Sequence, residues 1–195
     1  MLNSALTERD FGCGNFVFHL VSALLKLKAS RQTDPAARAD FHRAIERINT
    51  IAYLHERLYR AGDVERVDMQ DYLADICGNL SESLLEERGV KLQSEIQAFA
   101  LHIDKAVPVG LIVNELITNA AKYAFPGRND GTITVRLRTR GQRATLTISD
   151  NGRGLEPGAA PGVGSRLVKS LAGQIGARLR IVSGRGVTCS LTFSG

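Results

Sequence analysis

The stretch NELITNAAKYAF, residues 114–125, decides the fold, because it sets a few polar side chains into an otherwise apolar helix. Glu115 and Asn119 are four residues apart, so they lie on one face of the helix, one turn from each other. Lys122 follows on the same side. An acid, an amide and a cation on one stripe suit a magnesium ion held by oxygen ligands, with the lysine countering phosphate charge. Taken alone, the pattern also suits a solvated helix face, and both interpretations stay open.

A second polar segment, SDNGRGL at residues 149–155, directly follows a strand of alternating pattern. An aspartate at the end of a strand can accept a hydrogen bond from an exocyclic amine, and Asp150 has that place. Gly152 and Gly154 would let the backbone approach an aromatic ring. By itself, the same segment is a turn that carries a solvated acid.

Two further glycine segments lie closer to the C-terminus. PGVGSRLV, residues 161–168, puts Gly162 and Gly164 ahead of a helix whose N-terminal amides can face phosphate. SGRGVTCSLTF, residues 183–193, puts Thr188 at the start of a strand. A structural turn is the alternative for the first segment, and a hairpin turn is the alternative for the second.

The composition indicates a soluble protein with enough chain to bury a core. Of 195 residues, 44% are hydrophobic and 23% charged. The net charge of +5 is modest and Trp is absent, so we expect no nucleic-acid binding. The three cysteines are far apart, which favours reduced thiols. The longest apolar stretch, residues 16–27, is too short to span a bilayer, and we expect a cytoplasmic protein.

The first part of the chain, residues 1–62, is predicted to be a helical hairpin. A turn at residues 32–35, with a proline, separates two helices that each carry an apolar stripe. Two antiparallel helices cannot bury such wide faces between themselves, so the pattern predicts a homodimer that closes a four-helix bundle. The apolar positions at coiled-coil spacing in the first helix are Val17, Leu20, Leu24 and Leu27.

The second part, residues 63–195, reads as helices and a mixed sheet that form an α/β sandwich of normal domain size. Asp68 and Asp104 are the expected N-caps of two helices, with Pro108 in the first turn of the second helix. A short helix is expected near residues 167–171. One strand is expected to start at Val90. Four others are expected to cover residues 132–138, 144–148, 179–182 and 189–193.

The order of the four polar segments is specific. In this order, the sequence resembles the GHKL ATP-binding fold, which histidine kinases, gyrase, Hsp90 and the MutL repair proteins share. Residues 114–125 look like the N box, 149–155 the G1 box, 161–168 the G2 box and 183–188 the last glycine box. The resemblance implies an α+β chain, in which a dimeric hairpin for histidine phosphotransfer precedes a GHKL (Bergerat-type) α/β sandwich.

That resemblance implies a site for ATP and Mg²⁺. Asn119 would hold the metal ion, and Glu115 would assist it or orient the attacking group. Asp150 would bond the adenine amino group, and Gly162 and Gly164 would border a lid over the phosphates. The other residues that the resemblance implies for nucleotide contact are Lys122, Tyr123, Gly152, Gly154 and Thr188.

The segment available for the lid, residues 155–161, is short and holds no phenylalanine. The F box of most histidine kinases is therefore missing, as in the HWE histidine kinases and their sister class. Residues 47–73 and 107–126 resemble the sister class. Asn114 stands where HWE members carry His, so the chain is identified as a member of the sister class.

The usual phosphoacceptor of that class is replaced in this chain. The first helix of the class usually carries a His-Arg-Val-Lys-Asn-Asn-Leu-Gln motif before a Ser-Ser-Leu-Leu-like run. Aligning Ser22–Leu25 on that run puts Gly12 at the phosphoacceptor position, and glycine has no nucleophile. His19, seven residues further on, lies on the same polar face and is either a displaced acceptor or a solvated helix position. Two other histidines, His42 and His55, are expected to be structural, whereas His102 shows no partner in the sequence.

Three functions stay open at this stage. The first is a histidine-kinase-like enzyme of two-component signalling, which binds MgATP, docks the receiver domain of a response regulator and uses His19 or a partner sensor kinase's histidine as acceptor. The second is a non-catalytic pseudokinase or adaptor. The third is a GHKL ATPase in which Glu115 polarises water. The ATP boxes favour the first function, Gly12 favours the second, and the helical hairpin counts against the third.

Overall fold

The computed structural model consists of two compact units, Met1–Glu65 and Arg66–Gly195, which we describe separately. The predicted boundary after residue 62 lies close to this division. The structure describes residues 18, 20–35, 37, 38, 41, 42, 44, 45, 47–49, 52, 66–156, 158 and 162–195.

The first unit holds two helical segments that run side by side. Residues 20–30 are helical, and a second helix begins at Pro35, where a missing amide hydrogen costs nothing. The Asp34 side chain accepts a hydrogen bond from the Ala37 amide at 3.4 Å and so caps this helix. The buried Ser22 hydroxyl donates to Asn49 Oδ1 at 3.0 Å, which ties the two helices together.

The leucine stripe predicted for the bundle lies open in the single chain. Leu20, Leu24 and Leu27 are 47%, 54% and 51% exposed. In the second helix, by contrast, Ile45 and Ala52 are buried. Among the described residues of the hairpin, one apolar face is therefore covered within the chain, and the other is about half-exposed.

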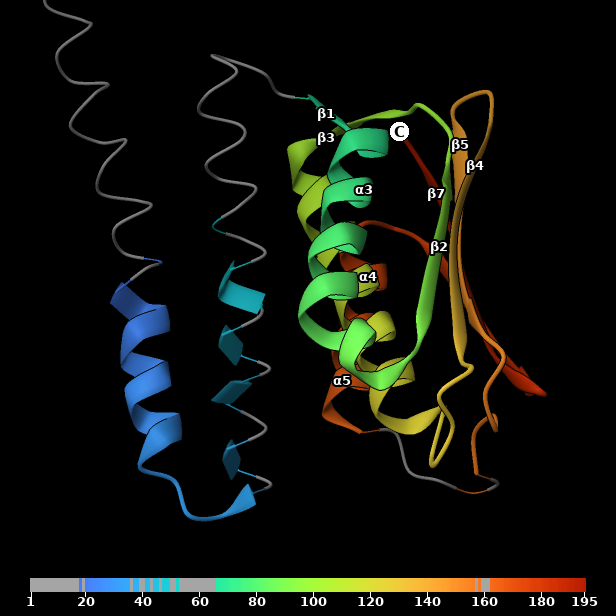
Figure 1. Cartoon of the computed structure of the whole chain (residues 1–195). Helices are drawn as coiled ribbons and strands as arrows, with labels where there is room; N and C mark the ends of the chain where they lie inside the picture. Colours follow the sequence, from blue (N-terminus) through green and yellow to red (C-terminus); the bar gives the residue numbers. More distant parts are fainter. Residues whose placement is uncertain are drawn as a thin grey trace, which may run out of the picture. The chain divides into compact units, whose positions relative to one another are not determined.

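The second unit is an α/β sandwich, as the sequence predicts (Figure 1). Its helices α3, α4 and α5 form one layer, and a five-stranded sheet of order β2-β4-β5-β7-β6 forms the other. Strands β2 and β4 are parallel, and the remaining neighbours are antiparallel. The elements are β1 (Arg66–Asp68), α3 (Met69–Leu80), the π-helical turn η1 (Ser81–Leu85), the 3-10 turn η2 (Glu86–Arg88), β2 (Lys91–Ile96), β3 (Ala100–His102), α4 (Ile103–Tyr123), β4 (Thr132–Arg140), β5 (Arg143–Asp150), α5 (Val163–Gln174), β6 (Arg178–Gly184) and β7 (Gly186–Ser194).

The core of the sandwich lies between the sheet and α4. Alternate residues in the first part of β4 are fully buried, namely Ile133, Val135 and Leu137, because successive side chains of a strand point to opposite faces. On the helical side, Tyr72 packs directly against Gly110 of α4, where a Cβ atom would overlap the tyrosine side chain. This close contact explains why a helix interior carries a glycine.

The start of α4 differs from the prediction. Its N-cap is His102, whose Nδ1 accepts a hydrogen bond from the Asp104 amide at 3.3 Å. Asp104 lies in the first turn instead, so its prediction as N-cap was wrong, and Pro108 consequently falls in the second turn. An imidazole nitrogen can act as a cap acceptor, but it is a rarer one than the carboxylate that follows it, so the local pattern favoured Asp104.

Other elements lie where the sequence predicts them, but some of them differ from the prediction in length. Asp68 caps α3, as predicted, by accepting a hydrogen bond from the Gln70 amide at 2.8 Å. Helix α5 starts at Val163, earlier than predicted, because Gly164 lies in its first turn and weakens the helical signal there. The short strands β1 and β3 pair with each other over a long sequence separation, and three residues each are too few to show an alternating pattern.

Candidate functional site

The polar stripe of α4 is enclosed by the protein. Glu115 is only 3% exposed and Asn119 is half-buried, so the carboxylate does not belong to a solvated helix face. Beside them, Thr118 donates from its hydroxyl to Asn114 Oδ1 at 3.4 Å. Lys122 is half-buried one turn further along the helix. Of these polar groups, Glu115 and Asn119 lie on the face of α4 that meets the first turn of α5.

The first turn of α5 closes on this pair of side chains. A Cβ atom added to Gly164 would lie 2.8 Å from Glu115 Oε2 and 3.2 Å from Asn119 Nδ2. The structure therefore brings the glycine segment around Gly164 close to Glu115 and Asn119, although it is far from them in sequence. Gly162 is the exposed N-cap of α5. Only a residue without a side chain leaves room at position 164 for the two polar groups as they stand.

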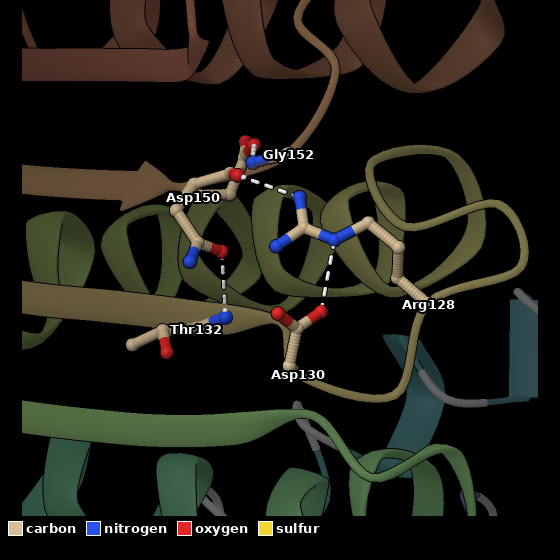
Figure 2. Close-up of polar contacts among 6 residues, drawn as sticks. Arg128, Asp130, Thr132, Asp150 and Gly152 are labelled. Atoms are coloured by element: carbon tan, nitrogen blue, oxygen red, sulfur yellow. Dashed lines mark hydrogen bonds and ion pairs between the residues drawn. The ribbon is translucent and has the colours of Figure 1, made fainter.

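Asp150 ends β5 on the same side of the sheet as the helices. It continues the buried register of Leu146 and Ile148, so its side chain faces the helical layer. Its Oδ1 accepts a hydrogen bond from the Gly152 amide at 2.9 Å (Figure 2). The carboxylate is thereby held in one orientation at the start of the glycine turn.

The two glycines of this turn allow close backbone contacts on both sides. At Gly152, a Cβ atom would overlap the carbonyl and side chain of Ala124, at the end of α4. Gly154 has a φ of +80°, and a Cβ atom there would approach the Gly184 carbonyl of the β6–β7 hairpin. The Leu155 amide donates to Ser183 Oγ at 2.8 Å. The turn is therefore fixed between α4 and the hairpin.

The last glycine segment is the hairpin between β6 and β7. Gly186 has a φ of +92° and packs on the Asp150 carbonyl, where a Cβ atom would not fit. Thr188 pairs with Ser149, so it faces away from the helices, whereas its buried neighbour Cys189 faces the core. The structure does not bring the Thr188 side chain together with Asp150. Counting the alternation back from the apolar residues of β7 would have shown this from the sequence.

The loop between α4 and β4 carries a contact that the sequence did not indicate. Arg128 donates from Nε to Asp130 Oδ1 at 2.9 Å and from Nη1 to the Asn151 carbonyl at 3.2 Å (Figure 2). Asn151 in turn accepts a hydrogen bond from the Thr132 amide at 2.8 Å with its Oδ1. The guanidinium of Arg128 holds the pKa of the Asp130 carboxyl below its usual value, chiefly through this hydrogen bond. An arginine in a polar loop has no sequence pattern that would reveal its partner.

The C-terminal end of α4 is held by two other arginines. Arg88 donates to the Ala121 carbonyl at 3.2 Å, and Arg153 donates from Nε to the Tyr123 carbonyl at 3.0 Å. Cations at this end also interact favourably with the helix dipole. The Tyr123 side chain itself is 56% exposed. The Arg153 contact places the Tyr123 carbonyl beside the glycine turn that follows Asp150.

Some predictions fall outside the described residues, namely those for Gly12, His19 and His55. His42 is described and is exposed. In the described part of the chain, no group of three or more His, Cys, Asp or Glu residues could hold a metal ion by itself. A magnesium ion at Glu115 and Asn119 would therefore depend on phosphate and water for its other ligands.

The described cysteines are free thiols, as expected. Burial raises the pKa of the Cys77 thiol to about 12 and that of the Cys189 thiol to about 11, which makes both unreactive near neutral pH. Among the residues that the structure describes, we find no helix with the length and apolar character that crossing a membrane requires.

The fold and the arrangement of these residues define a helical hairpin joined to a GHKL-type ATPase domain. A family model described as "Histidine kinase" (HisKA_2) matches residues 17–84. A model described as "Histidine kinase-, DNA gyrase B-, and HSP90-like ATPase" (HATPase_c) matches residues 104–194. Together they cover most of the chain, which belongs to the histidine kinase family. The predicted sister class of the HWE kinases is confirmed.

Curated relatives agree with this assignment. The chain is 25% identical over 156 residues to the sensor histidine kinase PdtaS of Mycobacterium tuberculosis, a match that covers 77% of this chain and 31% of PdtaS. It is 24% identical over 174 residues to blue-light-activated histidine kinase 2 of Erythrobacter litoralis, covering 85% of this chain and 50% of that protein. The chain thus spans half or less of the length of these relatives.

Solved structures show the same fold. The histidine kinase domain of the Erythrobacter litoralis EL346 blue-light-activated kinase matches with a TM-score of 0.71 and 21% identity, over 90% of this chain and 95% of that domain. The catalytic domain of the histidine kinase ThkA matches with a TM-score of 0.56 and 12% identity, over 66% of this chain and 94% of that domain. The predicted α/β sandwich of the GHKL class is confirmed.

Proposed function

We propose that this protein binds MgATP between α4, α5 and the turn after β5 and acts as a histidine-kinase-like component of two-component signalling. The observation that carries the proposal is the closure of Gly164 on the buried Glu115 and the half-buried Asn119, on the same side of the sheet as Asp150. Three segments far apart in sequence thus contribute to one side of the sheet. Helix α4 offers oxygen ligands, α5 offers its N-terminus, and the end of β5 offers a carboxylate that can accept a hydrogen bond.

The residues present suit this ligand. Glu115 and Asn119 offer oxygen atoms, which Mg²⁺ prefers, and Lys122 offers a cation for phosphate. The N-terminal amides of α5 follow Gly162 and would add further donors to phosphate oxygens. A bound magnesium ion would neutralise phosphate charge. In phosphoryl transfer the protein contributes mainly positioning and electrostatic stabilisation, and a buried Glu115 would orient the attacking group.

Asp150 would select the base. A carboxylate whose orientation is fixed by the Gly152 amide can accept a hydrogen bond from the adenine amino group. The close packing at Gly152 and Gly154 supports the same role, because it brings backbone rather than side chains to that region. The exposed Tyr123 would lie beside the phosphates, near Lys122.

The residue that accepts the phosphoryl group is a separate part of the proposal. The sequence alignment puts Gly12 at the usual acceptor position, so we propose that phosphoryl transfer goes to His19 or to a histidine of a partner sensor kinase. A non-catalytic adaptor, in which nucleotide sets only the conformation, is the second candidate, and Gly12 is the residue that favours it. In either case the helical hairpin would dock the receiver domain of a response regulator.

We also propose that the protein is a cytoplasmic homodimer. Leu20, Leu24 and Leu27 are about half-exposed at coiled-coil spacing, and pairing two hairpins through this stripe would close a four-helix bundle. The proposal of a cytoplasmic protein rests on the sequence, whose longest apolar stretch, residues 16–27, is too short to span a bilayer.

Incubation of the protein with γ-labelled ATP and Mg²⁺ tests the function. The wild type, His19→Ala and the exposed-histidine control His42→Ala are compared, and label is assayed for lability in acid and stability in base. Label that disappears only in His19→Ala identifies a kinase with a displaced acceptor. No label on a chain that binds ATP supports the adaptor or a partner's histidine as acceptor, and absence of ATP binding contradicts the proposal.

A further inference from the structure

The turn after β5 contains a peptide group that is hydrogen-bonded at both of its ends. Its carbonyl belongs to Asn151 and accepts from Arg128 Nη1 at 3.2 Å. Its N–H belongs to Gly152 and donates to Asp150 Oδ1 at 2.9 Å. Figure 2 shows Arg128 on one side of the turn and Asp150 with Gly152 on the other. Because the peptide group is planar, its carbonyl and its N–H cannot rotate independently.

Arg128 is itself held in place at two points. Its Nε donates to Asp130 Oδ1 at 2.9 Å, and its own amide donates to the Phe125 carbonyl at 3.3 Å. The planar guanidinium is a rigid fork, so the bond to Asp130 also sets the direction of the Nη1 donor. The loop after α4 thus presents one fixed cationic donor to the Asn151 carbonyl.

The remaining contacts of Asn151 tie the same turn to β4. Its amide donates to the Thr132 carbonyl at 3.2 Å, and its Oδ1 accepts from the Thr132 amide at 2.8 Å. These two bonds hold Asn151, the residue before the peptide group, but they do not involve the peptide group itself. Its rotation is restrained by the hydrogen bonds that its own carbonyl and N–H make. Arg128 therefore restrains the rotation of this peptide group from the carbonyl side.

We propose that Arg128 is a positioning residue for the base-binding carboxylate. Through the Asn151–Gly152 peptide group it orients the N–H that holds Asp150, and it thereby sets the affinity of the site for an exocyclic amine on a purine. A charged donor on the carbonyl also polarises the peptide group and strengthens the bond to Asp150. The inference rests on the proposed function, since it assigns Arg128 to the same nucleotide site.

Two nucleotides and four proteins test it. MgADP and the magnesium complex of purine riboside diphosphate, whose base lacks the amine, are titrated calorimetrically into the wild type, Arg128→Gln, Arg128→Lys and Arg138→Gln. Arg138 is the matched control, because it is an exposed arginine that donates to Glu95 at 2.6 Å on the opposite face of the sheet. Thermal melts verify that every variant is folded.

We expect Arg128→Gln to lower MgADP affinity about tenfold, the size of one charge-assisted hydrogen bond, and to leave the affinity for the analogue nearly unchanged. Arg128→Lys should recover part of the loss, and Arg138→Gln should behave as the wild type. Equal weakening of both nucleotides would show a merely structural role and overturn the inference, as would unchanged MgADP affinity.

A second variant keeps the test decisive if Arg128→Gln does not fold. Asp130→Asn removes the ion pair that directs the guanidinium but keeps the side-chain shape, and a smaller loss confined to MgADP is expected. A loss shared by both nucleotides would contradict the inference here too. A wild type that binds neither nucleotide would overturn the proposed function, and a wild type that binds both equally would overturn only the role of Asp150 and Arg128.

Discussion

The two units of this chain differ in how completely each buries its apolar residues. In Arg66–Gly195, the inward residues of β4 and β5 are buried against the helical layer. In the hairpin, Leu20, Leu24 and Leu27 keep about half of their surface exposed. The ATPase domain thus buries its core within one chain, whereas the hairpin leaves its leucine stripe about half-exposed.

The difference follows from layer architecture. A sheet that packs one face on helices closes its core within one chain, and its other face can remain polar. Two antiparallel helices cannot cover apolar stripes this wide between themselves, so in the proposed four-helix bundle a second pair of helices covers them. Nucleotide binding should therefore depend on the domain alone, and assembly on the hairpin alone.

The largest expected effect is that of Asn119→Ala. Removal of the proposed metal ligand should abolish measurable MgATP binding in calorimetry, because the divalent ion would lose a side chain that holds it against the phosphates. The oligomeric mass should stay that of the wild type. Asn79→Ala, at an exposed position of α3, is the control and should bind normally. Retained affinity in Asn119→Ala would remove the nucleotide site from this account.

The next largest effect is expected for Leu24→Glu, which tests the helical hairpin. A dimer contains this leucine twice, and burial of each side chain contributes about 1.5–3 kcal/mol. We expect light scattering to show a monomer, with MgATP affinity unchanged. Lys28→Glu alters an exposed position of the same helix and should leave the mass as it is. A wild-type monomer at micromolar concentration would contradict the bundle.

Gly164→Ala should have a moderate effect that is confined to the site. The added Cβ would lie 2.8 Å from Glu115 Oε2, so the carboxylate would have to move. We expect nucleotide affinity to fall about tenfold with little change in melting temperature. At the exposed Gly173 of the same helix, by contrast, a Cβ would meet no heavy atom of the described residues within 4 Å, so Gly173→Ala serves as the control. Equal behaviour of the two variants would argue against the closure at Gly164.

The smallest expected effect is the pH dependence contributed by Glu95. The hydrogen bond from Arg136 lowers the pKa of Glu95 below its ordinary 4.5, with a further contribution from Arg138. A lowered pKa in the folded state stabilises the protein above pH 4.5, and this stabilisation is lost as pH falls through the folded value. In Glu95→Gln, the acid side of the melting-temperature profile should be flatter. Because the group is exposed, the change should be small and should shrink further in high salt.

Much of the fold was predictable from the sequence, because its signals are local. The polar stripe of α4 and the Asp68 cap each rest on residues within a turn or two of one another. The closure of Gly164 on Glu115, the His102 cap and the Arg128 contact could not be predicted in the same way. Each depends on which of several chemically suitable groups the tertiary structure brings within reach. The Thr188 prediction followed the motif rather than the strand alternation, which places that side chain on the outer face.

The most direct test of the central claim is to titrate a magnesium complex of a non-hydrolysable ATP analogue into the full chain and into residues 66–195. If the nucleotide site is complete within this unit, both proteins should bind with the same Kd, and the shorter one should be monomeric. A shorter protein that is folded but binds no nucleotide, or binds it far more weakly, would show that the hairpin supplies part of the site and would contradict the account.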